Sequence, residues 1–180
     1  LGGSSWSLLS ALLLVAAAVV VYNAHIVQIQ KHRFKRSPGS GIQWSVYGNY
    51  TLGAAVIAML AYALWKPQVL YQTKSVTLAV WVYLAGWVSF TILCYLTKIV
   101  PFLWWTWKYG SQAGKPGTPV MSDLLSDKKV SAGLAAVAVS GLLPLAGLLS
   151  DSHPIVAAGG AAHSIFSIAY MLLIGRVFSR

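Results

Sequence analysis

Carboxylates are almost missing from this chain of 180 residues, which contains three Asp, no Glu and 13 Lys or Arg. None of the three, Asp123, Asp127 and Asp151, lies within a long apolar run, so no acid is placed to relay protons across a membrane. This absence argues against a proton-coupled pump contained in this chain alone. Cysteine is equally scarce, and the single Cys94 excludes an intrachain disulfide and any Cys-pair metal or redox motif.

Motifs of common enzyme classes are missing as well. The sequence contains no phosphate-binding Gly loop, no His-Glu-x-x-His zinc motif, and no Ser, His and Asp in an order that suggests a hydrolase. We therefore expect no complete catalytic site in this chain alone.

Apolar residues dominate the composition that is present. The chain is 57% hydrophobic and 9% charged, and its mean hydropathy of +0.68 lies outside the range of soluble domains. A net charge of +10 could suggest nucleic-acid binding, but the basic residues fall between apolar runs, where positive charge sets membrane topology. These features predict an all-α, polytopic transmembrane helix bundle without nucleic acid as a partner.

Five apolar runs are long enough to cross a hydrocarbon core of about 30 Å as helices. The predicted spans cover about residues 6–27, 44–65, 76–97, 130–149 and 155–178. We expect them to form a single transmembrane domain over residues 1–180, with basic cytoplasmic loops at 28–43 and 108–129. A brief interfacial helix is expected at 121–125, with Asp127 as the cap of the helix that follows.

Positive charge is distributed unevenly around these spans. Lys66 and Lys74 are the two cations of one side. The other loops and the C-terminus hold Lys31, Arg33, Lys35, Arg36, Lys98, Lys108, Lys115, Lys128, Lys129, Arg176 and Arg180. This asymmetry predicts an N-terminus outside and a C-terminus in the cytoplasm, and we expect a bacterial inner membrane. Since no signal peptide is recognisable, we also expect further chain before Leu1.

A cluster of aromatic and basic residues follows the third predicted span. Its predicted interface anchors are Lys98, Pro101, Trp104, Trp105, Trp107 and Tyr109. Trp, Tyr and Lys concentrate where hydrocarbon meets lipid headgroups, and Lys98 can reach the headgroups by snorkelling. Pro101 should kink or end the helix because proline cannot donate the helical hydrogen bond. The three Trp could also stack a pigment, a quinone or a lipid, but an aromatic belt explains them more simply.

Small residues recur at four-residue spacing in the last two predicted spans. They are Ala132, Ala136 and Ser140 in the fourth span and Gly160 and Ser164 in the fifth. This spacing places small side chains on one helix face, where another helix can approach closely. We interpret both faces as helix-packing surfaces.

Two histidines are candidates for cofactor binding, because imidazole is the usual ligand of haem inside a membrane. His163 is placed in the outer part of the last span and His25 near the inner end of the first. At about 1.5 Å per residue, their depths differ too much for the two to clamp one haem. A hydrogen-bonded structural residue is the first interpretation of His163, and a ligand to haem or pigment completed by a partner chain is the alternative. His32 in the basic loop and His153 beside Pro154 are weaker candidates.

The region around the third span resembles a family of bacterial membrane proteins. Gly86-Trp87 is followed by Thr97-Lys-Ile-Val-Pro-Phe-Leu-Trp-Trp105 and then by Lys108-Tyr109. This order is similar to a motif of haem-copper oxidase subunit I and NnrS-like proteins. The oxidase-related members carry a His-x-His pair just before the Gly-Trp, whereas residues 80–85 contain no histidine. The resemblance therefore implies the C-terminal half of such a protein, or a shortened relative, without the metal site of that motif.

These features lead to one functional expectation and two alternatives. We expect an integral membrane subunit with a structural or assembly role in a larger respiratory or photosynthetic electron-transfer complex. Its expected partners are the lipid bilayer and other membrane subunits. The first alternative is a haem-binding redox protein that uses His163 or His25 with a partner chain, and the second is a transporter subunit.

Overall fold

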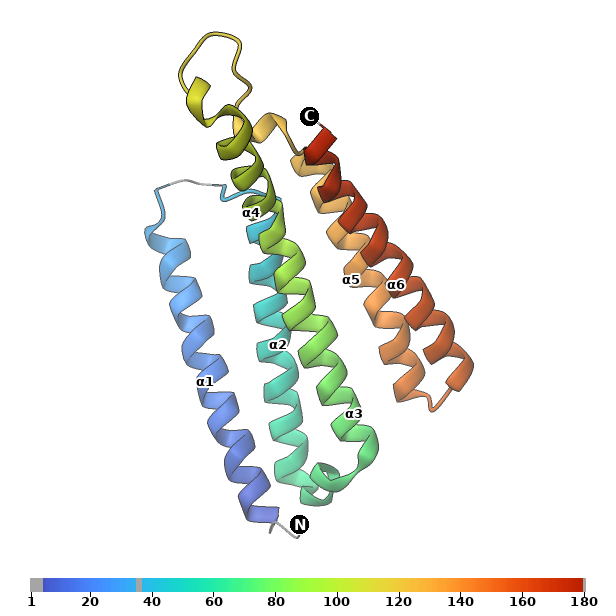
Figure 1. The fold of residues 1–180 in the computed structure, drawn as a ribbon. Coiled ribbons are helices and arrows are strands. Elements are labelled where there is room, and N and C mark those ends of the chain that lie inside the picture. The colour runs from blue at the N-terminus through green and yellow to red at the C-terminus, as the bar shows by residue number, and fades with distance from the viewer. Residues whose placement is uncertain (1–4, 35–36, 180) are drawn as a thin grey trace. The chain divides into compact units, whose positions relative to one another are not determined.

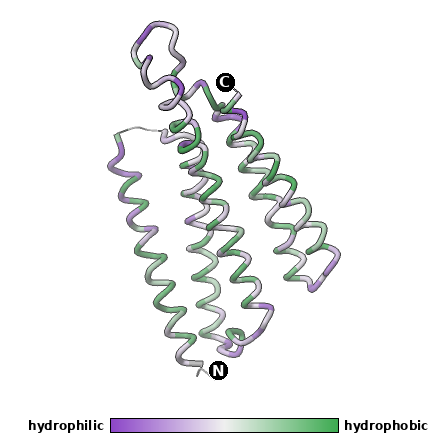
Figure 2. The backbone as a smooth tube through the Cα atoms, in the orientation of Figure 1, coloured by the Kyte–Doolittle hydropathy of each residue, from purple (hydrophilic) through white to green (hydrophobic). Residues whose placement is uncertain are grey.

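The computed structural model describes residues 5–34 and 37–179, and all regular structure within these ranges is helical (Figure 1). Five helices are long and apolar enough to cross a membrane: Trp6–His32, Ser40–Trp65, Thr73–Gln112, Asp127–Leu149 and His153–Ser179. Figure 2 shows hydrophobic residues along these helices and hydrophilic residues mainly toward their ends. The prediction of an all-helical protein with five such helices is confirmed, while the orientation of the termini stays a prediction. Lys35, Arg36 and Arg180 lie outside the described residues.

The first two helices are longer than the sequence predicts. α1 (Ser5–His32) continues beyond the expected end at residue 27 and has basic residues in its last turn. Positive charge is favourable beside the free carbonyl groups at a helix C-terminus, so these residues extend the helix instead of ending it. α2 (Ser40–Trp65) also begins before the expected residue 44. The basic loop expected at 28–43 is therefore shortened from both sides.

The third apolar run is one continuous helical segment of changing geometry. It comprises α3 (Thr73–Trp81), the π-helix η2 (Val82–Ser89), α4 (Phe90–Tyr109) and the 3₁₀ turn η3 (Gly110–Gln112), and it follows the 3₁₀ turn η1 (Pro67–Tyr71). Pro101 lies buried inside α4, so the helix does not end at this proline. The alternative, a kink at Pro101, stays a prediction. Proline removes one backbone hydrogen bond, and neighbouring helices can compensate for that loss in a membrane helix.

The last two helices form an antiparallel hairpin with a tight turn between them. They are α5 (Asp127–Leu149) and α6 (His153–Gly175), and α6 continues into the 3₁₀ turn η5 (Arg176–Ser179). The two helices approach closely at Gly147 and Gly159, where a Cβ would collide with the facing helix. The interfacial helix expected at 121–125 is a single 3₁₀ turn, η4 (Met121–Asp123).

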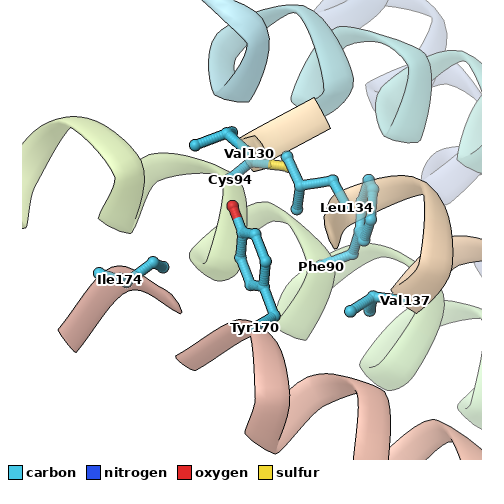
Figure 3. Packing of buried hydrophobic residues seen from close by; sticks show 7 residues of the cluster. All are labelled: Phe90, Cys94, Val130, Leu134, Val137, Tyr170 and Ile174. Carbon is cyan, nitrogen blue, oxygen red and sulfur yellow. The ribbon is translucent and has the colours of Figure 1, made fainter. Parts of the chain in front are cut away.

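The chain divides into two compact units. Among the described residues, the first unit comprises 5–34 and 46–88 and includes α1, α3 and most of α2. The second comprises 37–45 and 89–179 and includes α4, α5 and α6. The core of the second unit is a buried cluster from these last three helices (Figure 3): Phe90, Cys94, Val130, Leu134, Val137, Tyr170 and Ile174. This core holds the candidate residues of the second unit in place.

Candidate functional site

The contact between α5 and α6 is the setting for the polar candidate residues of the second unit. A Cβ atom on Gly147 would lie 2.6 Å from Val156 N, and one on Gly159 would lie 2.6 Å from Pro144 N. Real Cβ contacts are not that short, so the missing side chains let the two backbones approach each other. The helices therefore pack backbone against backbone along this face.

Ser140 and His163 form a polar pair within this contact. Ser140 is buried, and its Oγ donates a hydrogen bond to Val137 O at 2.9 Å. The same Oγ lies 3.1 Å from His163 Nδ1. Because a hydroxyl has one hydrogen, Oγ accepts from His163 Nδ1–H when it donates to Val137 O. Gly141 lies beside the ring, since a Cβ there would sit 3.5 Å from His163 Nδ1. Ser140 thus orients the imidazole, as hydrogen-bond partners do for ligand histidines in metal proteins.

The other three histidines lie apart from this pair. His25 is exposed on α1 and belongs to the first unit, whereas His163 belongs to the second. His32 Nδ1 lies 2.9 Å from Gln28 O within α1, and His153 is the exposed first residue of α6. Within the described ranges, no three His, Cys, Asp or Glu side chains gather into a group that could hold a metal ion. A haem held by His25 or His163 with a ligand from a partner chain stays a prediction.

The small residues predicted to form the face of α5 contribute unequally to packing. Ser140 is buried, Ala136 is half-buried and Ala132 is exposed. The four-residue spacing therefore identifies the contact with α6 at one end only. Near Ser140 the contact continues through Gly141, which the spacing rule does not include.

The face predicted for α6 is displaced by one residue from the face that packs within the chain. A Cβ on Gly160 would meet nothing within 4 Å, and Ser164 is exposed with its Oγ donating to Gly160 O at 2.9 Å. Gly159 makes the close contact with α5 instead. Adjacent helical residues differ by about 100° in direction, so the spacing of small residues alone could not select between two neighbouring glycines. A helix-packing role for Gly160 and Ser164 stays a prediction.

Lys98 lies where three segments of the second unit meet. Gly39 has a φ of 94°, and the space of its missing side chain is occupied by the Lys98 ammonium group. Asp127 Oδ1 lies 3.6 Å from the same Cβ position and accepts a hydrogen bond from Ser40 N at 3.4 Å. Asp127 is therefore not the predicted cap of α5, because Ser126 holds that position and Asp127 is turned toward α2. The fold gives Lys98 an acidic neighbour that the sequence does not indicate.

The aromatic residues at the end of α4 contact one another and η5. The ring centroid of Trp104 lies 4.9 Å from that of Trp107 and 5.3 Å from that of Phe178. Lys108 Nζ lies over the rings of Trp104 and Tyr109, at 5.7 and 5.4 Å from their centroids. Cation–π contacts of this kind hold an ammonium group beside aromatic rings. The role of these residues as interface anchors stays a prediction.

The loop that follows α4 folds back on the helix end. Trp105 Nε1 donates a hydrogen bond to Pro119 O at 2.7 Å, which ties the far end of the loop to α4. Gly114 and Gly117 have φ values of 82° and 86°, a conformation that favours glycine and turns the chain twice. Trp105 is therefore a structural clamp for this loop in addition to its predicted place in the aromatic belt.

Two amide side chains in the first unit form contacts that the sequence does not indicate. Asn49 is buried, and its Oδ1 accepts a short hydrogen bond from Trp87 Nε1. Asn23 Nδ2 donates to Val19 O at 2.9 Å and lies 3.1 Å from the position of a Cβ on Gly53. An Asn inside an apolar run was the available signal in both cases, because a polar side chain there needs a partner.

Tyr170 and Cys94 lie at the centre of the core of the second unit. The Tyr170 ring fills the space beside Gly133, where a Cβ would approach the ring atom Cε2 to 2.9 Å. Figure 3 shows the hydroxyl directed toward Cys94, and the oxygen has no hydrogen-bond partner within the described chain. A buried hydroxyl without a partner costs free energy, so the packing of the Tyr170 ring has to offset this cost.

No family model, curated protein or solved structure matches this chain. The resemblance to haem-copper oxidase subunit I and NnrS-like proteins is therefore neither supported nor refuted, and it stays a prediction. From the residues themselves, the arrangement offers one oriented imidazole between two apolar helices, at His163, and a basic aromatic cluster at the end of α4.

Proposed function

We propose that this chain is an integral membrane subunit with a structural or assembly role in a larger electron-transfer complex. The observation that carries the proposal is the exposure of two long helices. Of the most apolar 18 residues of Trp6–His32 and of Thr73–Gln112, 6% are buried inside the protein. The corresponding share for Ser40–Trp65 is 28%. Helices that their own chain covers so little offer long faces to lipid and to neighbouring subunits.

The exposed side of α6 supports the same proposal. Gly160 has open space around its Cβ position, and Ser164 one turn later satisfies its hydroxyl within its own helix. Small residues four apart let a helix of another subunit approach closely without leaving an unpaired polar group. The contact predicted for this face is therefore proposed with a partner helix instead of with α5.

The setting of the proposed complex rests on the sequence. The motif around Gly86-Trp87 suggests a respiratory or photosynthetic assembly, and the uneven positive charge suggests a cytoplasmic C-terminus in a bacterial inner membrane. Five apolar helices support the membrane location itself.

Photo-crosslinking from α1 in the native membrane tests the proposal. Leu14 is 73% exposed, so a photoreactive residue there should form crosslinks to other membrane subunits if α1 lies in a complex. Ala16 on the same helix is 6% exposed and serves as the matched control, which should give crosslinks within the chain only. Oxidase, cytochrome or photosynthetic subunits in the products would support the proposal. A stable monomer with lipid adducts alone at Leu14 would contradict it.

A second candidate function, haem or pigment binding with a partner chain, is favoured by one observation. Ser140 fixes the orientation of His163 from Nδ1, as hydrogen-bond partners of ligand histidines do. An optical spectrum of the native complex should then show a Soret band that His163→Ala removes and the exposed His32→Ala leaves unchanged. A band that survives His163→Ala would assign the haem to another position, and a spectrum without a band would contradict this candidate.

A further inference from the structure

The start of α5 and the end of α6 lie along α4 in the second unit. Val130 at the start of α5 and Ile174 at the end of α6 pack in the same core cluster as Cys94, in the first turns of α4. Beyond this cluster, the rings of Trp104 and Phe178 join the end of α4 to η5. All three helices belong to segments long and apolar enough to cross a membrane, so the region where the later part of α4 meets η5 belongs at a membrane surface.

This surface, which we call the basic end, carries exposed cations from each of the three helix ends and from the loop after α4. They are Lys108, Lys115, Lys128, Lys129 and Arg176. The carboxylates of this end within the described ranges are Asp123 and Asp127, which accept hydrogen bonds from Val120 N at 3.2 Å and from Ser40 N at 3.4 Å. Asp127 also lies beside Lys98 at the Gly39 turn. Cations therefore outnumber carboxylates at the basic end, and the two carboxylates are directed to the backbone.

Large apolar side chains lie next to these cations and are also exposed. Trp107 is 76% exposed, and Leu103 and Phe178 are each more than half exposed. Lys108 Nζ is held over aromatic rings, which keeps its charge at the border between the apolar and basic parts of the surface. A ligand that fits this surface has an anionic group and long apolar chains in one molecule.

We propose that the basic end binds the headgroups of anionic phospholipids, with their phosphates at the Lys and Arg side chains and their acyl chains along the exposed aromatic residues. Anionic lipid attracts cations near a bilayer surface, whereas a zwitterionic headgroup has no net charge to contribute. An acidic protein segment would satisfy the cations but not the apolar border. The proposal concerns the isolated protein and does not depend on the assembly role proposed above.

Reconstitution of the full chain into two kinds of vesicle tests this inference. Phosphatidylcholine vesicles with phosphatidylglycerol are compared with vesicles of phosphatidylcholine alone, by thermal unfolding and by native mass spectrometry of retained lipid. The protein should unfold at a higher temperature and retain more lipid with phosphatidylglycerol. The double variant Lys128→Gln/Lys129→Gln should lose about fivefold in preference for phosphatidylglycerol for each cation removed.

A double variant with the same loss of charge in the first unit, Lys66→Gln/Lys74→Gln, provides the control. It should retain the preference for phosphatidylglycerol, since these residues are not part of the basic end. Unfolding in phosphatidylcholine alone shows whether either variant is folded. If the wild type behaves alike in both vesicles, or if both double variants lose the preference equally, the proposed site is overturned. Replacing Arg176 by Gln instead of the lysine pair gives an independent test should the pair fail to fold.

Discussion

The two units of this protein hold their helices together by different means. In the second unit, Gly159 brings the backbones of α5 and α6 into direct contact. In the first unit, α1 and α2 meet through side chains, because Asn23 lies against Gly53 and Tyr50 Oη donates to Gln30 Oε1 at 3.4 Å. In one contact backbone lies against backbone, and in the other a polar side chain lies against a glycine.

This difference shows which forces remain available to helices in lipid. Lipid tails are as apolar as leucine, so removing apolar surface from lipid stabilises a contact little. Close packing and hydrogen bonds remain, and the second unit relies mainly on the former while the first relies more on the latter. We therefore expect added volume to damage the second unit most and lost polar groups to damage the first.

The largest effect is expected for Gly159→Leu. The new side chain would overlap the backbone at Pro144 and Leu143, neither of which can move without shifting α5, so we expect a loss of about 3 kcal/mol or more. The free energy of unfolding in mixed micelles, measured by titration with a denaturing detergent, checks this expectation.

Gly160→Leu is the matched control, because its Cβ position is open and the substitution should change stability by less than about 0.5 kcal/mol. Equal losses of stability for the two variants would contradict the contact of α5 and α6 through Gly159. A stable Gly160→Leu protein that no longer assembles with other subunits would show that Gly160 contacts another subunit.

The same substitution in both units gives the next largest effect. Gly133→Ala places a methyl group against the buried Tyr170 ring and should cost about 1–3 kcal/mol by overpacking. Gly53→Ala meets the amide end of Asn23, which can turn away, and alanine favours the helix. It should therefore be close to neutral. A larger loss at Gly53 than at Gly133 in thermal unfolding would reverse the comparison between the units.

Removal of a polar partner should affect the first unit by about 1 kcal/mol. Trp87→Phe keeps an aromatic ring but leaves the buried Asn49 Oδ1 without its donor, and interhelical hydrogen bonds in membranes contribute about 0.6–1.7 kcal/mol. Trp107→Phe, at an exposed position, is the control for loss of an indole. If both variants unfold at the same detergent concentration, hydrogen bonding does not stabilise the first unit.

The smallest effect is expected for the polar pair of the second unit. Ser140→Ala removes the partner of His163 Nδ1 while the backbone contact around it remains, so the loss should be about 0.5 kcal/mol. Ser164→Ala removes a hydroxyl bonded within its own helix and should have no measurable effect. A loss at Ser140 as large as that at Gly159 would mean that hydrogen bonding, not close packing, holds α5 to α6.

The helices themselves could be predicted from the sequence, but their ends and contacts could not. Long apolar runs identify all five helices, because length and hydropathy are properties of the chain alone. The helix through Pro101 could not be foreseen from local rules, since neighbouring helices can compensate for the missing hydrogen bond. His163 was recognisable as a polar residue in an apolar run, yet its partner Ser140 lies 23 residues away on another helix.

The sequence by itself determined that the helices belong in a lipid bilayer. The chain has too few charges and too many apolar residues for a water-soluble domain, and its helices are long enough to cross a membrane. Only the tertiary structure decided which small residues touch. Gly159 packs and Gly160 does not, although the two are neighbours of identical chemistry. The reason is geometric, because a turn of about 100° between adjacent residues separates a contact face from an open one, and only the position of α5 selects between them.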